Sequence, residues 1–168
     1  MKYSNWKPPP NDIVKFNVDG SYIQYSNSFG TGVVLRNHTC TCHGIKGSYG
    51  DGALNPEAVE CMAVIEALSW AKDLKFSRIQ IEADAKLVID TINGNILLIQ
   101  WENRNIIKEI KYLISSFSLC EFVHVSRDNN QVADAVAKHV SQSALSILTD
   151  GNFNAGFYDL LAKDHNPC

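Results

Sequence analysis

The feature that most constrains the fold is an alternating segment, residues 13–19, in which apolar and polar side chains follow one another. The three apolar residues at positions 14, 16 and 18 would point to one face of a β-strand, and the polar residues between them to the other. Asp19 ends this segment and Gly20 follows it. The pattern predicts a strand that ends in an aspartate on its polar face, with a glycine at which the chain turns. An ordinary strand-end turn is the alternative interpretation.

The rest of the chain predicts an α/β fold with a mixed sheet. Two further strands, residues 32–36 and 40–46, favour an antiparallel meander with the first. Asn55 and Pro56 mark the start of a helix that runs to residue 74, since asparagine is a good N-cap and proline suits the first helical position. The other predicted elements are strands at residues 78–84 and 120–126 and helices at residues 85–92, 101–117 and 130–143. A five-stranded mixed sheet flanked by helices would result.

Length and composition favour one globular domain. The chain has 168 residues, of which 45% are hydrophobic, and this suffices for a full core. We expect a proline-bearing leader at residues 1–12, the domain itself at residues 13–143 and a tail at residues 144–168. The sequence has no run of about eighteen apolar residues, and its start lacks the apolar core of a signal peptide. We therefore expect no membrane partner and an intracellular protein that is not secreted, whether nuclear, cytoplasmic or in an organelle.

The net charge of −3 argues against a generally basic nucleic-acid-binding surface. Contact with nucleic acid would need a local basic strip, or metal ions that neutralise the phosphates. A site built from carboxylates and metal ions is itself acidic, so the charge of the chain is compatible with such a site.

Four acidic residues stand where predicted elements begin or end: Asp19, Glu60, Asp84 and Asp134. Glu60 starts an apolar stripe of mostly small residues in the first helix, where a carboxylate is unusual. Asp84 ends the fourth strand on its polar side, as Asp19 ends the first. Each acid also has an ordinary interpretation: a hydrated glutamate near a helix start, an N-cap, or compensation of the dipole of the last helix.

These four acids could converge at one end of the sheet. A cluster of carboxylates is unfavourable without a cation, because like charges raise one another's pKa. Mg²⁺ or Mn²⁺ binds few carboxylates and keeps room for water and phosphate oxygens. Two such ions about 4 Å apart would activate a water and stabilise the leaving oxygen of a phosphodiester. This chemistry requires no covalent nucleophile.

The motifs around these acids, taken in order, resemble those of type 1 ribonuclease H. They are VDGS at residues 18–21, ECMAVIEAL at residues 60–68, EADA at residues 82–85 and NQVADAVA at residues 130–137. The leader sequence WKPPP at residues 6–10 and GVVLR at residues 32–36 bring the resemblance closest to the plant, retroelement-derived branch of that family. The resemblance covers residues 6–141.

What the resemblance implies is a three-layer ribonuclease H-like fold and an endoribonuclease that hydrolyses the RNA strand of an RNA–DNA hybrid. The enzyme would use two Mg²⁺ ions, for which Mn²⁺ would substitute. Asp19, Glu60, Asp84 and Asp134 would be both catalytic residues and metal ligands, with Asp19 bridging the ions. The RNA would be recognised through its 2′-hydroxyls. We also expect a monomer.

Substrate contacts are expected from residues in neighbouring loops: Gly20, Ser21, Asn27, Asn55 and Arg127. The loop at residues 22–27 lacks the Gly-Asn-Pro-Gly pattern common in the family, Arg127 stands near the place of a mobile histidine, and the basic handle of some members is missing. These departures leave a second hypothesis open, a catalytically weak or silent domesticated domain that binds nucleic acid or protein. A third hypothesis keeps the metal chemistry but changes the substrate.

Overall fold

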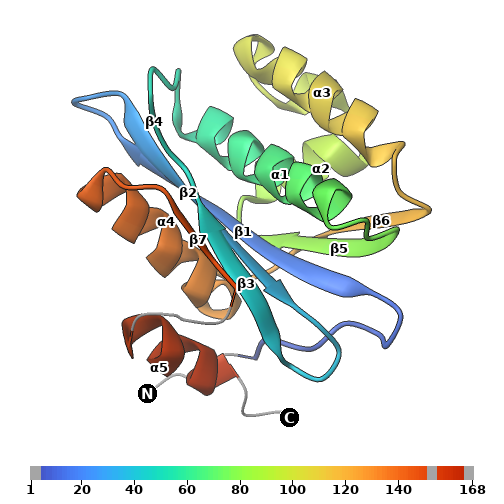
Figure 1. Ribbon diagram of the computed structural model, residues 1–168. Coiled ribbons are helices and arrows are strands. Elements are labelled where there is room, and N and C mark those ends of the chain that lie inside the picture. Colours follow the sequence, from blue (N-terminus) through green and yellow to red (C-terminus); the bar gives the residue numbers. More distant parts are fainter. Residues whose placement is uncertain (1–4, 151–154, 165–168) are drawn as a thin grey trace.

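The computed structural model describes residues 5–150 and 155–164, and its elements form three layers (Figure 1). A mixed β-sheet is the middle layer. One face of the sheet is covered by three helices, α1 (Pro56–Asp73), α2 (Lys86–Asn93) and α3 (Arg104–Ile114). The opposite face is covered by two, α4 (Gln131–Ser143) and α5 (Ala155–Asp164).

An antiparallel meander forms one half of the sheet. Strand β1 (Val14–Ile23) pairs with β2 (Ser28–Arg36), and β2 pairs with both β3 (Cys42–Gly47) and the short β4 (Tyr49–Asp51). A further short strand, β7 (Ile147–Thr149), pairs with the outer edge of β3. The strand order along the sheet is β6-β5-β1-β2-β3-β7.

Two parallel strands, β5 (Arg78–Ala83) and β6 (Leu119–His124), extend the sheet on the other side of β1. Each is reached through a helical crossover, α1 before β5 and α2 with α3 before β6. Two 3-10 turns, η1 (Ile96–Leu98) and η2 (Trp101–Asn103), lie between α2 and α3, and η3 (Arg127–Asn129) lies between β6 and α4. The parallel register of β1 and β5 ends at Asn17 and Glu82, so these strands are not paired beyond that point.

The core has one half on each face of the sheet. Alternation along β1 directs Phe16 and Val18 to the α1 face, where they pack with buried residues of α1, α2, α3 and β5. Val34 of β2 points to the other face and packs with α4 and with Phe157 of α5. The start of α1 is as predicted, because Asn55 Oδ1 accepts a hydrogen bond from the Ala58 N–H at 2.8 Å.

The predicted mixed sheet with helices on its faces is confirmed, but the predicted number of five strands is wrong, since the sheet has seven strands in the described residues. The added strands, β4 and β7, have three residues each and are too short to show an alternating period. The predicted end of the first strand at Asp19 is also wrong. β1 continues through Gly20 to Ile23, because β2 stays paired with it along this whole length.

The segments before and after the central domain also pack on the sheet. Trp6 in the leader is 1% exposed, and in the tail β7 pairs with β3 while α5 packs against α4. The boundaries of the three predicted segments stay a prediction. In the described part of the chain, no helix has the length and apolar character needed to cross a membrane.

Candidate metal centre

Asp19 lies in β1 directly after the point where β1 and β5 part. Because the parallel register ends at Asn17 and Glu82, Asp19 is paired only on its β2 side, with Gly32. Asp19 is buried, with an exposed fraction of 5%. Open sheets with parallel strands bind ligands at the carboxyl ends of those strands. The position of Asp19 is therefore suited to a ligand site.

Gly20 allows the start of α1 to approach β1. A Cβ at this position would lie 2.9 Å from the backbone carbonyl carbon of Val59, closer than real Cβ contacts. The Gly20 N–H donates a hydrogen bond to the Glu60 carboxylate. This close approach places Glu60 beside Asp19, so Gly20 serves the packing of α1 rather than the predicted turn.

Asp84 and Asp134 each have an exposed basic partner. Asp84 follows β5, and its Oδ2 lies 3.3 Å from Arg127 Nε. Asp134 lies in the first turn of α4, and its Oδ2 accepts a hydrogen bond from Lys138 Nζ at 2.8 Å. The alternative role of Asp84 as an N-cap is not observed, because the N-cap residue of α2 is Ala85.

Three of the four acids come together as a group that we call the carboxylate cluster. Carboxylate oxygens of Asp19, Glu60 and Asp84 all lie within 4.8 Å of one another. Asp134 is not a member of this group, but its charge contributes to raising the pKa of both Asp19 and Glu60. Glu60 Oε2 is buried without a hydrogen-bond partner. A buried oxygen in this state is costly to the fold unless a ligand satisfies it.

Burial and mutual repulsion oppose ionisation in the carboxylate cluster. Burial raises the pKa of Asp19 to about 9, and the charge of Glu60, followed by those of the other acids, adds to the increase. Burial and the charge of Asp84 raise the pKa of Glu60 to about 8, although a backbone N–H and Arg127 act in the opposite direction. A bound divalent cation would reverse both effects by favouring the ionised carboxylates.

The donor set of the carboxylate cluster suits Mg²⁺ or Mn²⁺. It offers carboxylate oxygens only, from β1, from α1 and from the residue after β5. Hard divalent cations prefer such oxygen ligands, whereas zinc sites are built mainly from cysteine and histidine. The buried Glu60 Oε2, which has no hydrogen-bond partner, also fits this role, because a bound cation would supply the missing partner. The arrangement can therefore hold a metal ion and bring phosphate oxygens to it.

Two of the predicted substrate contacts lie close to elements of the centre. Arg127 is exposed on η3 and borders the carboxylate cluster through its ion pair with Asp84. Asn55 precedes α1, and besides capping that helix it hydrogen-bonds Asn103 Nδ2 at 3.0 Å.

The other three predicted contacts are engaged within the protein. Gly20 lies against the backbone of α1. Ser21 Oγ shares a hydrogen bond of 2.9 Å with Ser141 Oγ of α4, and Asn27 Oδ1 accepts one of 2.7 Å from Tyr22. The substrate-binding roles of all five residues stay a prediction.

Two residues next to the centre were not expected from the sequence, Asn130 and Lys138. Asn130 Nδ2 donates to the Val18 carbonyl at 2.8 Å, which ties the start of α4 to β1. The i, i+4 spacing of Asp134 and Lys138 is a readable signal for their ion pair. No local pattern, in contrast, indicates that the Asn130 side chain reaches a strand more than a hundred residues away.

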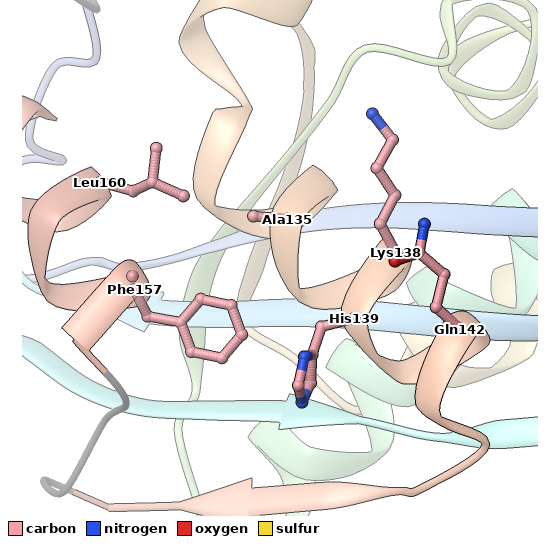
Figure 2. A pocket seen from close by; sticks show the side chains of 7 residues that line it. Ala135, Lys138, His139, Gln142, Phe157 and Leu160 are labelled. Atoms are coloured by element: carbon pink, nitrogen blue, oxygen red, sulfur yellow. The ribbon is translucent and has the colours of Figure 1, made fainter.

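A separate hollow of about 350 Å³ lies between α4 and α5 (Figure 2). The rings of His139 and Phe157 meet edge to face there, with centroids 5.8 Å apart. None of the described residues that line the hollow is acidic. It therefore lies outside the carboxylate cluster, although Lys138 contacts both the hollow and Asp134.

In a comparison with known protein families, residues 17–140 match the family described as reverse transcriptase-like. The matched segment contains all four predicted acids, Asp19, Glu60, Asp84 and Asp134. None of the curated proteins compared with the chain matches it.

Solved type 1 ribonucleases H have a similar fold. RNase H1 from the halophilic archaeon Halobacterium salinarum NRC-1 is 23% identical with a TM-score of 0.71, over 79% of this chain and 99% of that chain. An N-terminal RNase H domain from Mycobacterium tuberculosis is 22% identical with a TM-score of 0.71, over 79% and 95%. LC11-RNase H1, solved in complex with an RNA/DNA hybrid, is 18% identical with a TM-score of 0.71, over 78% and 98%. The predicted ribonuclease H-like fold is confirmed.

Proposed function

The chain belongs to the reverse transcriptase-like family and has the fold of type 1 ribonucleases H, and on this premise we propose that it is a metal-dependent endoribonuclease acting on RNA–DNA hybrids. The observation that carries the proposal is the carboxylate cluster, with its unpaired Glu60 oxygen at the carboxyl end of β5. A relative of the same fold has been solved with an RNA/DNA hybrid bound, which supports the choice of substrate class.

The proposed cofactor is Mg²⁺, with Mn²⁺ as a substitute, and two ions take part. Asp19, Glu60 and Asp84 would hold the metal, and Asp134 at the margin of the cluster would complete the ligand set for a second ion. When bound, the ions supply an activated water and stabilise charge on the leaving oxygen. The residues of the chain bind and orient the phosphodiester, and none of them needs to form a covalent bond to it.

Several groups at the rim of the centre would contact the hybrid. Arg127 is exposed and carries its charge beside Asp84, so its guanidinium would bind a phosphate held at the metal. Asn55, near the start of α1, would have to exchange its hydrogen bonds with Asn103 for a contact with the hybrid. We assign Gly20, Ser21 and Asn27 the weaker role of shaping the neighbouring backbone, because their surroundings within the protein already engage them.

A second function, a silent domain that binds nucleic acid or protein, is favoured by one observation. Ser21 Oγ is hydrogen-bonded to Ser141 and Asn27 Oδ1 to Tyr22, so both oxygens are engaged within the protein. Such a domain would keep the fold and lose the reaction. Binding and cleavage therefore have to be measured separately.

The test uses one labelled RNA strand in three forms: hybridised to DNA, paired with RNA, and single-stranded. A DNA duplex of the same sequence is the fourth substrate. We expect cleavage of RNA in the hybrid only, dependent on Mg²⁺ or Mn²⁺, abolished by EDTA and restored by excess metal. Hybrid binding without cleavage in either metal, at micromolar protein, would instead establish the silent binding domain. Cleavage of another substrate in preference to the hybrid would refute the proposed substrate class.

A further inference from the structure

The two ends of the described chain meet in a buried polar network on the α4 face of the sheet. Trp6 of the leader donates from Nε1 to Asn17 Oδ1 at 3.0 Å. Asp164 of α5 binds Arg36 Nη1 at 2.7 Å, and Arg36 Nη2 donates to the same Asn17 oxygen at 2.8 Å. The Arg36 guanidinium also lies over the Trp6 ring, 3.9 Å from its centroid. All four side chains are buried, and Asn17 is their common partner.

From Asn17 the network continues toward the metal centre. Asn17 Nδ2 donates to Glu82 Oε2 at 3.0 Å and to Asn130 Oδ1 at 3.3 Å. Asn17 and Glu82 are the last residues paired between β1 and β5. Asp19 follows two residues after Asn17, and Asp84 two residues after Glu82. The network therefore joins the two strands directly before the residues that carry two of the carboxylates.

Asn130 carries the network to a third part of the centre. Its Nδ2 donates to the Val18 carbonyl at 2.8 Å, and this carbonyl belongs to the peptide unit that leads into Asp19. β1 has already lost β5 as a partner at this point, so Asn130 takes the place of a strand neighbour. The Asn130 carbonyl accepts a hydrogen bond from the Asp134 N–H at 3.1 Å in the first turn of α4. One side chain thus connects the backbones that bear Asp19 and Asp134.

We infer that Trp6 and Asp164 are positioning residues of the metal centre, which act through Asn17 and Asn130 on the backbone around Asp19 and Asp134. The inference rests on the proposed function, because it assumes that these acids bind metal. It adds that the leader and α5, which lie far from the acids in sequence, set the geometry of the site.

A stabilising role alone would not require such a network. Burying polar and charged groups is expensive even when they are paired, and apolar residues of similar size would stabilise the same contact at less cost. Polar networks instead fix one arrangement, since each hydrogen bond has a required direction. In metal sites, the partners that orient the ligands change metal affinity by about 10–100-fold when they are lost.

The primary test compares W6F with W70F by calorimetric titration of the metal-free protein with Mn²⁺, well below the melting temperature of each variant. W6F removes the Nε1 donor to Asn17 and keeps an aromatic ring beside Arg36. W70F makes the same substitution in the core on the other face, near the far end of α1 from Glu60. We expect the dissociation constant for Mn²⁺ to rise about tenfold in W6F and to stay unchanged in W70F.

Turnover provides the second readout. If Trp6 positions the metal ligands, saturating Mn²⁺ should restore the kcat of W6F on the hybrid, whereas a loss of folded protein would not be restored by metal. D164N tests the other end of the network, with D12N, which alters the exposed Asp12–Arg78 pair, as its matched control. We expect D164N to weaken Mn²⁺ binding and D12N to leave it unchanged.

Two results would overturn the inference while the proposed function stands: Mn²⁺ affinity in W6F equal to that of the unmodified protein, or an equal loss in W6F and W70F. Failure of the unmodified protein to bind Mn²⁺ would overturn the metal centre itself, and the inference with it. The two failures are thus told apart by the titration of the unmodified protein.

Discussion

Lys15 and Asp19 lie four residues apart on β1 and are both buried, yet the charges around them are arranged in opposite ways. Lys15 Nζ lies 2.5 Å from Glu82 Oε1, and on the same face Arg36 Nη1 lies 2.7 Å from Asp164 Oδ2. We call these four residues the paired cluster, because each charge has a counter-charge. Asp19, in contrast, meets two further carboxylates in the carboxylate cluster.

The contrast separates charges that hold the fold from charges that require a ligand. In the paired cluster, burial lowers the pKa of Lys15 and Arg36, whereas the attraction and hydrogen bonds of Glu82 and Asp164 favour the ionised state. In the carboxylate cluster, burial and repulsion both oppose ionisation and raise the pKa of Asp19 and Glu60. The carboxylate cluster therefore lowers the stability of the metal-free protein. A bound cation would offset this loss, because it favours the ionised carboxylates.

The largest effect is expected from D19N in the carboxylate cluster. Asp19 belongs to the carboxylate cluster, and losing its charge would remove the several kcal/mol by which a bound metal would stabilise the transition state, about 10³-fold or more in rate. Hybrid cleavage by the variant should fall to background while its circular dichroism spectrum is unchanged. D12N, at an exposed ion pair, is the matched control and should cleave normally. Cleavage by D19N within tenfold of the unmodified protein would contradict the role of Asp19.

A smaller effect, on the stability of the fold rather than on cleavage, is expected from E82Q in the paired cluster. The substitution leaves the buried Lys15 ammonium without its counter-charge, which should lower the free energy of unfolding by about 3–5 kcal/mol. Urea denaturation measures this loss. E121Q, at an exposed position of β6 that is paired with Gln80, should change stability by less than about 0.5 kcal/mol. Equal stability of E82Q and E121Q would remove the distinction between the two clusters.

The same Glu to Gln substitution should stabilise the protein when it is made in the carboxylate cluster. E60Q relieves repulsion with Asp84. We therefore expect the free energy of unfolding of the metal-free variant to exceed that of the metal-free unmodified protein by about 1–2 kcal/mol, and its Tm to be higher by roughly 2–8 °C. Adding Mn²⁺ should raise the Tm of the unmodified protein but not that of E60Q. A lower Tm for metal-free E60Q would show that Glu60 is a structural residue.

A pH dependence of the metal-free protein is also expected. The pKa values of Asp19 and Glu60, about 9 and about 8, exceed the ordinary values of 3.8 and 4.5. The folded state therefore binds more protons than the unfolded state between about pH 5 and pH 9, and stability should fall as pH rises through this window. Thermal melts in EDTA should show this fall and melts in Mg²⁺ should reduce it. A Tm in EDTA that rises from pH 5 to pH 9 would contradict the raised pKa values.

Local patterns suffice to predict the elements that carry the four acids. The alternation of β1, the cap and proline before α1, and the aspartate that follows β5 are each encoded within a few residues, and the order of the motifs relates them to one family. Asp19 and Gly20 also show the limit of this reasoning. The sequence predicts a turn after Asp19, whereas the partner strand β2 extends β1 beyond it and the glycine makes room for α1.

Contacts between distant segments could not be predicted in the same way. Trp6 and Asp164 reach Arg36 from opposite ends of the chain, and no local period encodes that meeting. Alternation predicts that Lys15 and Asn17 share a polar face, but not that the leader and α5 bury this face. The short strands β4 and β7 depend on their partners β2 and β3 in the same way.

A crystal soaked in Mn²⁺ tests the central claim most directly. The claim is that the carboxylate cluster is a cation site and that the paired cluster is not. The anomalous difference map should show a peak among Asp19, Glu60 and Asp84, with a second near Asp134 when a hybrid is bound. No peak should appear beside the paired cluster, although Glu82 and Asp164 are acidic too. A map without density among the three carboxylates at millimolar Mn²⁺ would contradict the account.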